Sequence, residues 1–564
     1  MLTIVVPDAD EILALQDRER ALYYSIAAED VLRREGLISI ATDDRSNPRG
    51  GTAHLLTRDV VPAAEHLASG AIAACEGPLS AETLAWLGLA ARTVTVRKLR
   101  LHTPDRAQSW LMVRPAVKAG KPAAVVKHPR VWTNPRIAVQ VFKHIPPQNV
   151  LLHATLPNGK TVPAVFHHNG VWISALPVFD LIGQHFAFPP LVEKFSTRSR
   201  IKQMQTLSAE ITRQIADVLH RRADAVSVIC DRWPAGYASA FTVRHDYDRA
   251  ISQKSHDSLL ALYERLKLKC STAWLGYLAP AERIRDFAAR GHEIQVHAYE
   301  KDAADLAQTL DALDAVAGLP VRGATIHGGH SSIGFRGDRH FVWLEALGLD
   351  YVESFSVDHT CAPVYRPDPS GILRRSRLMA TPVHASLDDS IERDTQRSGV
   401  VAEQIRARLE EGGLAIAMNH PDLNREALVD LVEGLPRDGV WCATLGEICD
   451  WERASKYEPV VTREGETVRV QFARPLPHDA MLHLRRGQQA VQSMTVRAGT
   501  TQVTVSTQGV VSAETTPVAA PAFILTPRDG LLMQATGLPD ETLAQRSSRI
   551  AKSALFRARR LIRG

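Results

Sequence analysis

Four short polar clusters follow apolar runs that are typical of β-strands, and each carries side chains that can do chemistry. They read RHDYD at 244–248, GHEIQVHAYE at 291–300, HGGH at 327–330 and NHPD at 419–422. Carboxylates and imidazoles are ligands for zinc and other divalent metals, and a bound metal polarises a carbonyl group and activates water. A separate carboxylate could take a proton from that water, and a histidine could protonate a leaving amine. These residue types predict hydrolysis at a divalent-metal site.

The elements that would position these clusters alternate regularly from Ala238 onward. Strand SAFTVRH precedes helix SLLALYERLKL, strand STAWLGYL precedes helix AERIRDFAARG, and strand HEIQVH precedes helix KDAADLAQTLDALDAV. Later, strand GLAIAMNH precedes helix REALVDLVEG. This repetition predicts a parallel sheet, either open or closed into a barrel. In such folds the active site lies at the carboxyl ends of the strands, which is where the four clusters fall.

The order and spacing of RHDYD, GHEIQVHAYE, HGG and NHPDLN resemble the polysaccharide deacetylase family, also called the NodB-homology domain or carbohydrate esterase family 4. The resemblance covers about residues 238–455 and implies an irregular (β/α) barrel that hydrolyses acyl groups from the nitrogen atoms of sugars. It also implies roles for single residues. Asp246 would be the catalytic base, Asp248 and His297 would bind a divalent metal, with zinc as the expected ion, and His420 would be the general acid.

The chain departs from the usual family pattern at two places. Lys301 stands where a second metal-binding histidine is usual, and the arginine-x-proline-tyrosine motif is absent. The chain is similar instead to a divergent branch with a glutamate three residues after the metal-binding histidine and a histidine-glycine pair at the fourth strand. That similarity makes His327 the expected third ligand, with Glu300 behind it. We expect Arg244 and His330 to orient a carboxylate or bind substrate, although Arg244 could equally pair with a structural acid.

The same residues leave other interpretations open. Asp246 and Asp248 could cap the loop between a strand and a helix. Aspartate-x-aspartate is also the pattern that holds a nucleotide sugar through a metal, so a metal-dependent glycosyltransferase is an alternative, although it would not need the GHEIQVH, HGG and NHP segments. The missing second histidine also allows a catalytically degenerate domain that only binds glycan. The leading expectation is deacetylation of an N-acyl sugar in a glycan or glycan precursor, in surface polysaccharide (O-antigen-like, lipopolysaccharide) biosynthesis.

The formal net charge of +5 over 564 residues gives no reason to expect nucleic-acid binding. Six scattered cysteines form no C-x-x-C pair and fit free thiols in a reducing compartment. The N-terminus MLTIVVPDAD has no basic region before its apolar run, so it predicts a strand and not a secretory signal. We find no run of the ~20 apolar residues that cross a bilayer. These features predict a cytoplasmic protein.

The sequence divides into five expected segments. Residues 1–198 predict an open α/β domain, which weakly resembles glutamine amidotransferase-like domains without their catalytic cysteine through VLRREGLISIA and EGPLSAETLAWL. We expect this domain to be non-catalytic, with Cys75 as a buried structural thiol. The following segments are a helical connector at 199–237, the deacetylase-like barrel at 238–455 and a small antiparallel β-sandwich at 456–535.

The last segment, 540–564, predicts a basic amphipathic helix. Residues 541–564 hold seven Lys and Arg against one acid. At ~100° per residue the apolar side chains other than Phe556 share one face and the basic ones the other, as in helices that lie on anionic membrane surfaces. A helix packed on its own protein is the alternative. Contact with the inner face of the cytoplasmic membrane would place the enzyme beside a lipid- or nucleotide-linked carbohydrate substrate.

Overall fold

The computed structural model describes residues 2–6, 28–29, 31–44, 53–57, 70–113, 136–187, 198–222, 225–248, 251–276, 280–298, 300, 303–326, 343–354, 361–367, 373–382, 385–386, 396–421, 425–464, 467–487, 492–506 and 509–515. His327, His330 and the predicted helix at 540–564 lie outside these residues. Within them, no helix combines the length and apolar character that crossing a membrane requires.

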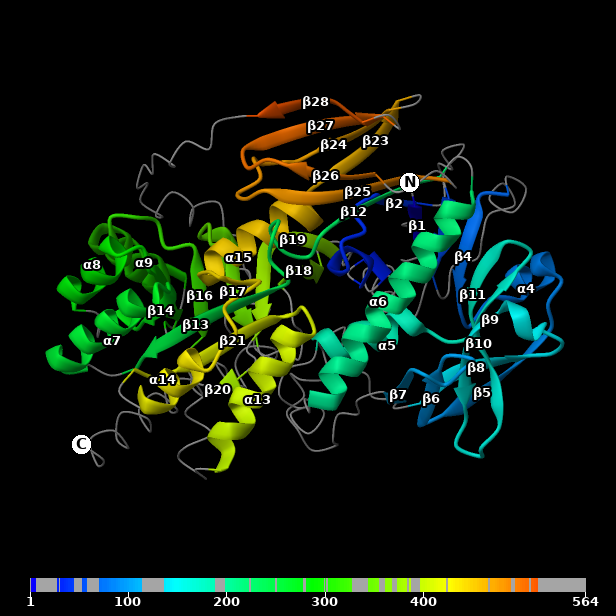
Figure 1. The fold of residues 1–564 in the computed structure, drawn as a ribbon, viewed down its shortest axis with the longest axis horizontal. Coiled ribbons are helices and arrows are strands. Elements are labelled where there is room, and N and C mark those ends of the chain that lie inside the picture. The colour runs from blue at the N-terminus through cyan, green and yellow to red at the C-terminus, as the bar shows by residue number, and fades with distance from the viewer. Residues whose placement is uncertain are drawn as a thin grey trace.

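The first sheet contains nine strands, in the order β2-β1-β3-β4-β11-β10-β9-β6-β7 (Figure 1). Its parallel half is built from β1 (Leu2–Val6), β2 (Ile40–Asp44), β3 (Ala53–Leu56), β4 (Ile72–Glu76) and β11 (Val171–Ser174). Its antiparallel half is built from β10 (Thr161–His168), β9 (Val150–Thr155), β6 (Lys98–His102) and β7 (Ser109–Val113). The pairing direction changes at β11, which is parallel to β4 and antiparallel to β10.

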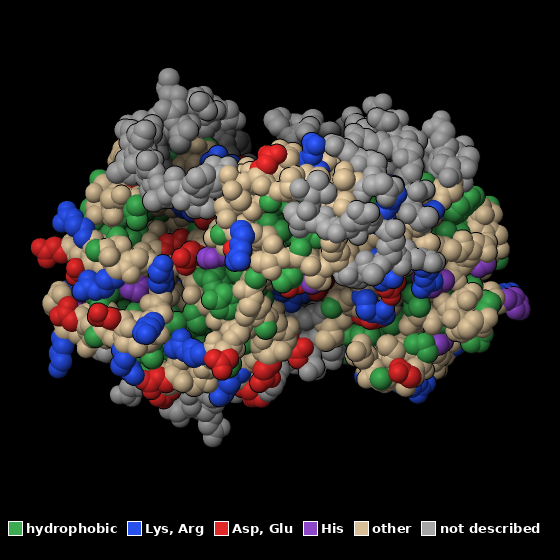
Figure 2. All heavy atoms as spheres, turned by 45° about the horizontal axis from the view of Figure 1, so that its top comes forward, with side chains coloured by type: hydrophobic (Ala, Val, Ile, Leu, Met, Phe, Trp, Pro, Cys, Tyr) green, Lys and Arg blue, Asp and Glu red, His purple; other side chains and the backbone are tan. Residues whose placement is uncertain are grey.

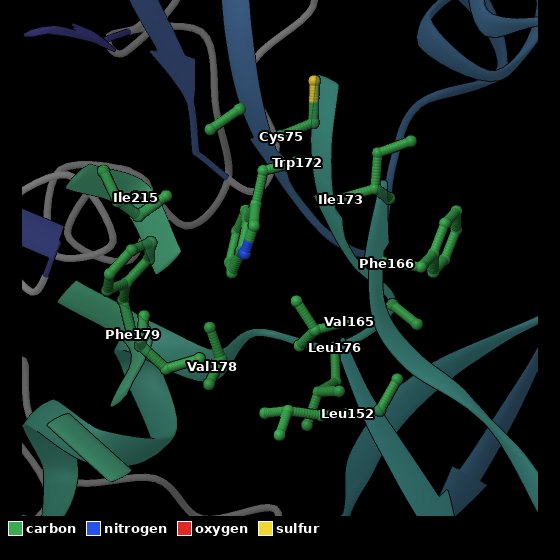
Figure 3. Close-up of a cluster of buried hydrophobic side chains, with 14 of the residues drawn as sticks. Cys75, Leu152, Val165, Phe166, Trp172, Ile173, Leu176, Val178, Phe179 and Ile215 are labelled. Atoms are coloured by element: carbon green, nitrogen blue, oxygen red, sulfur yellow. The ribbon is translucent and has the colours of Figure 1, made fainter. Parts of the chain in front are cut away.

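Two helices, α5 (Val178–Ala187) and α6 (Arg198–Arg221), pack against this sheet. Their shared core contains Trp172 of β11 and Phe179 of α5, whose ring centroids lie 6.2 Å apart, with Ile215 of α6 beside them (Figure 3). The indole nitrogen of Trp172 donates to the Gln214 side chain of α6 at 3.0 Å, so this buried polar atom is satisfied. Cys75 is fully buried in the same core, and burial raises the pKa of its thiol, as expected for a structural cysteine.

A short antiparallel ladder accompanies this sheet (Figure 1). It consists of β5 (Ala91–Val96) and β8 (Ile137–Phe142), and a helix α4 (Ala81–Leu87) precedes it. The helix begins where the Ser80 hydroxyl accepts a hydrogen bond from the Thr83 N–H, and it ends at Gly88, which has a φ of +65°. The chain therefore enters β5 through a turn that needs a left-handed residue.

The central sheet has ten strands, and all but one of its pairings are parallel. Its order is β18-β19-β17-β16-β15-β14-β13-β21-β20, with β22 also paired to β13. The strands are β13 (Ser239–Tyr247), β14 (Cys270–Trp274), β15 (Glu293–Ala298), β16 (Gly323–Ile326), β17 (Tyr351–Ser354), β18 (Ala362–Pro367), β19 (Leu373–Pro382), β20 (Ala385–Ser386), β21 (Leu414–Asn419) and β22 (Val440–Cys442).

Helices alternate with the strands from β13 to β16 and again from α13 to α15, as the sequence predicts. They are α7 (Gln253–Leu266), α8 (Ala281–Ala289), α9 (Ala303–Ala317), α13 (Gln396–Glu410), α14 (Arg425–Glu433) and α15 (Leu445–Glu452). Every residue of β13 is buried, which is usual for a parallel strand covered on both faces. In the described part of the chain, the edge strands β18 and β20 do not pair with each other. The sheet is therefore a curled half-barrel there and not the closed form of the expected barrel.

Two antiparallel sheets lie above the central sheet in Figure 1, and all but one of their strands come from the C-terminal part of the described chain. One contains β23 (Val460–Glu464), β24 (Thr467–Gln471), β27 (Thr500–Ser506) and β28 (Gly509–Thr515). The other contains β25 (Ala480–Arg486), β26 (Gln492–Val496) and β12 (Val226–Cys230). Both contribute to one buried apolar cluster. The strand β12 falls inside the range predicted as a helical connector, so that range is helix only as far as Arg221.

A buried ion pair lies where these parts of the chain meet. A π-helical turn, η5 (Arg453–Tyr457), follows α15 and carries Lys456, whose Nζ lies 2.8 Å from both carboxylate oxygens of Glu452. Neither side chain is exposed. The Arg33 guanidinium donates to the backbone carbonyl of Lys456 at 2.8 Å, and the Lys456 ammonium lies 5.1 Å from the ring centroid of Trp233. Burial lowers the pKa of Lys456, while Glu452 opposes that shift.

We predict that Glu452→Gln destabilises the fold strongly, because it leaves the Lys456 charge buried without its counter-ion. Breaking one side of a buried ion pair costs about 3–5 kcal/mol, whereas an exposed pair contributes about 0–1 kcal/mol. The matched control is Asp217→Asn, since Asp217 also pairs four residues from its partner, Arg213, but on the surface. Thermal unfolding followed by circular dichroism measures both. Equal shifts in Tm for the two variants would contradict the prediction.

Candidate functional site

The carboxyl ends of β13, β15 and β21 bring three of the four polar clusters to one edge of the central sheet. β13 lies between β14 and β21, and its register places His245 opposite Asn419. β15 follows on the other side of β14, and its register places His297 opposite Thr325 of β16. Residues far apart in sequence therefore meet here, as expected for the active edge of a parallel sheet.

Arg244 is the buried centre of a three-residue charge cluster. Its side chain is 1% exposed, and its guanidinium pairs with Asp246 on the same strand and with Glu353 on β17. One Arg244 N–H donates to Glu353 at 2.7 Å. One positive charge thus serves two buried carboxyl groups. Burial raises the pKa of Glu353 to about 8, with Arg244 opposing and Asp246 adding to the shift. Burial also acts on Asp246, but Arg244 and then His297 hold the pKa of Asp246 below its usual value.

His297 is oriented by the hydroxyl group of Thr325. Its Nδ1 lies 2.5 Å from Thr325 Oγ1, which in turn donates to Asp246 Oδ1 at 3.4 Å. Because an ionised carboxylate only accepts, the Thr325 hydrogen points to Asp246 and its oxygen accepts from the Nδ1–H of His297. The other ring nitrogen, Nε2, faces Asp248 Oδ1 at 3.0 Å. Fixing one ring nitrogen through a hydrogen bond is how proteins prepare a histidine for metal binding.

His420 completes the cluster on its solvent side. Its Nε2 lies 3.3 Å from the second carboxylate oxygen of Asp248, Oδ2. The side chains of His420 and Asp248 are 24% and 26% exposed, whereas those of His297 and Asp246 are 5% and 8% exposed. The site therefore runs from a buried end at Asp246 to an accessible end at His420. Asp248 and His420 can be reached from solvent, whereas Asp246 lies on the buried side of the site.

The residues present suit part of a divalent-metal site. Asp248 Oδ1 and His297 Nε2 are 3.0 Å apart, which is less than twice the ~2.0–2.2 Å bond length of zinc to such donors. Among the residues that the structure describes, no group of three or more possible ligands is arranged around one point. The expected third ligand, His327, lies outside those residues.

The other expected site residues have separate positions. Glu300 accepts a hydrogen bond from the Thr309 hydroxyl of α9 at 2.8 Å, so one of its oxygens faces a helix. His330 lies outside the described residues. Two residues of the cluster, Thr325 and Glu353, were not foreseen from the sequence. Both stand at the carboxyl ends of strands, β16 and β17, so the strand-end rule applied to every polar residue would have found them.

No family model and no curated protein sequence matches this chain. Similar solved structures include the family 4 esterase domain of a xylanase from the hindgut metagenome of Trinervitermes trinervoides, a Clostridium thermocellum acetyl xylan esterase with a cobalt ion, and a Bacillus subtilis peptidoglycan deacetylase. Their identities are 14%, 15% and 10%, and the TM-score is 0.25 for each. The matches cover 37% of this chain and 89%, 90% and 89% of those chains.

These neighbours are carbohydrate esterases and deacetylases of the family that the four motifs resemble.

We predict that Glu353→Gln changes how stability depends on pH. Folding raises the pKa of the Glu353 carboxyl group from its ordinary 4.5 to about 8. The folded protein therefore becomes less stable as the pH rises through this range. The variant lacks this loss. The difference in Tm, variant minus wild type, should therefore become more positive between pH ~5 and pH ~8. Glu433→Gln, in an exposed pair with Arg265, is the matched control. A difference for Glu353→Gln that stays flat or falls with pH would contradict the prediction.

Proposed function

We propose that this chain hydrolyses the amide bond of an N-acyl sugar, releasing the acyl group as a carboxylate and leaving a free amine on the sugar. One observation carries the proposal, namely the chain of contacts through Asp246, Asp248, His297 and His420. His297 lies 3.8 Å from Asp246 and 3.0 Å from Asp248, and His420 lies 3.3 Å from Asp248. Two carboxylates and two imidazoles thus share one partly open site, as metal-assisted hydrolysis requires.

Asp248 and His297 are the proposed ligands of a divalent metal, with zinc as the expected ion and His327 as the proposed third ligand. A bound divalent metal polarises the acyl carbonyl group and makes a water molecule more acidic. The chain's own contribution is orientation. Thr325 holds the ring of His297 so that Nε2 faces Asp248, and Asp248 presents its other oxygen to His420.

Asp246 is the proposed general base and His420 the proposed general acid. Arg244 holds the Asp246 carboxylate in one orientation, so that it can accept a proton from the attacking water. The water oxygen bonds to the acyl carbon, and the carbon–nitrogen bond breaks. His420, at the accessible end, donates a proton to the departing nitrogen. The proton taken up at Asp246 balances the one delivered by His420.

The proposed substrate is a glycan or a lipid- or nucleotide-linked glycan precursor. The proposed setting is surface polysaccharide biosynthesis, such as that of an O-antigen, on the inner side of the cytoplasmic membrane. The support is the expected cytoplasmic location together with the basic amphipathic segment at 541–564, which would hold the enzyme near such precursors. The partial exposure of Asp248 and His420 allows a sugar to approach from solvent.

The contacts of Asp246 favour hydrolysis over glycosyl transfer. In the alternative, a glycosyltransferase, the aspartate-x-aspartate pair would hold a nucleotide sugar through a metal. Asp246 is buried against Arg244, whereas Asp248 is partly exposed, so the two carboxylates are placed for different tasks. The remaining alternative, a degenerate domain that binds glycan without a metal, is an outcome of the experiment below.

We predict that Asp246→Asn and His297→Ala separate catalysis from metal binding. Asp246→Asn should lower kcat for acetate release at least ~100-fold while metal content stays unchanged, because a general base contributes ~10²–10⁴-fold. His297→Ala should lose both activity and metal. Acetate release from N-acetylated sugars and elemental analysis of the purified protein measure the two effects.

Asp257→Asn on α7 and His483→Ala on β25 are matched controls, since Asp257 is exposed and accepts from Gln253 of its own helix, and His483 contacts Ser493 and Asp231. Both should keep activity and metal content. If Asp246→Asn lost its metal, Asp246 would be the metal ligand and Asp248 the general base. A wild-type protein that binds no metal and releases no acetate, but still binds glycan, would contradict the proposed function.

A further inference from the structure

The N-terminal region carries a positive charge that the net charge of the whole chain hides. Residues 83–179 contain thirteen Lys and Arg and one acid, Asp105, whereas the full chain has a net charge of +5. Seven of these cations are described, are exposed, and make no ion pair with another described residue. We call them the basic surface: Arg92, Arg97, Lys98, Arg100, Arg106, Lys143 and Lys160.

The pairing of β6 with its neighbours groups four of these cations. On β6, Lys98 and Arg100 are exposed, and the residues between and after them are buried, so both side chains lie on the outer face. Arg106 lies in the turn between β6 and β7, with a φ of +59°. Lys160 lies in the turn between β9 and β10, and β9 pairs directly with β6 at Arg100.

The β5–β8 ladder adds the other three cations. Arg92 pairs with Val141 near one end of this ladder, so it lies close to Lys143, which follows β8. Arg97 follows the other end of β5 and leads directly into β6. The two ladders are therefore joined by a single residue that is itself a cation, and they are neighbours in Figure 1.

Charge is balanced differently elsewhere on the molecule. Exposed cations of other elements pair with acids at 2.7 Å, as in Arg213–Glu210, Arg265–Glu433 and Arg497–Asp479. Figure 2 shows acidic and basic side chains intermixed on the side of the molecule where α7, α8 and α9 lie. The one acid of the basic region, Asp105, instead accepts hydrogen bonds from Thr103 Oγ1 and the Ala107 N–H within its own turn. Asp105 therefore does not neutralise the cations of the basic surface.

We propose that the basic surface binds the anionic head groups of a membrane. Cations near a negatively charged bilayer are attracted within about a Debye length, ~8–10 Å, and need no shaped pocket. Single-stranded nucleic acid would require exposed aromatic side chains for stacking, but Trp110, Phe142, Phe166 and Trp172 of these strands are buried. The proposal does not depend on the deacetylase activity.

The test measures binding of the full-length protein to vesicles of phosphatidylglycerol and phosphatidylcholine. The variant Arg97→Gln, Lys98→Gln, Arg100→Gln should bind about 100-fold more weakly, because each basic residue near an anionic surface contributes about fivefold. Added salt should weaken wild-type binding, and vesicles of phosphatidylcholine alone should not bind. Thermal unfolding of the variant shows whether its fold is intact.

The control variant Lys254→Gln, Arg265→Gln, Arg285→Gln removes the same charge from exposed positions on α7 and α8 and should bind like wild type. Equal weakening of both variants would overturn the proposal, as would binding to phosphatidylcholine alone. A chain ending at Asp540 that loses all binding, with no effect of the triple substitution, would assign membrane contact to residues 541–564 alone. Duplex DNA or an acidic polysaccharide that binds more tightly than the vesicles, through the same three residues, would also overturn it.

Discussion

The buried guanidinium of Arg244 is the contact on which the candidate site depends. It joins β13 to β17 by pairing with Asp246 on one strand and Glu353 on the other. A charge withdrawn from water is tolerated only when it is paired and hydrogen-bonded, so Arg244 requires both strands to end at this place. β13 in turn pairs with β14, β21 and β22. Fixing its carboxyl end therefore fixes where His297 and His420 can meet Asp248.

A single hydroxyl group connects that charge cluster to the proposed metal ligands. The Thr325 hydroxyl group has one hydrogen. When this hydrogen is donated to Asp246, the hydroxyl oxygen can still accept a hydrogen bond from His297. The base and the ligand are thus linked through one hydrogen-bond chain, and the direction of each bond follows from the previous one. A valine at this position would keep the shape of the strand. It would remove the hydroxyl group that contacts Nδ1, so the tautomer of His297 would no longer be fixed by this contact.

The sequence predicts the strand ends and the acidic and histidine residues on them, because local periodicity and residue type suffice for that. It does not reveal Glu353, which lies 109 residues from Arg244 and meets it only through the curl of the sheet. Nor does it reveal that β12 pairs with β25, since a strand's partner is not a local property.

The acid of the GHEI motif, Glu293, has a structural contact that the sequence does not reveal. Glu293 accepts from the N–H of Gly446 at 3.0 Å and so holds the start of α15. A Cβ at Gly446 would lie 2.3 Å from Glu293, so the motif's acid is structural.

Helix α6 relates the basic surface to the candidate site. It has 24 residues, which at 1.5 Å per residue gives about 36 Å. On one side it contacts β4, β7 and β11 of the first sheet, and on another it contacts α13, which packs on β13 and β21. One rigid element is thus shared by the two sheets, so the orientation of one constrains the other. If the strands β5 to β9 rest on a membrane, the height of the Asp248–His420 opening above it is set by α6 and not by a flexible tether.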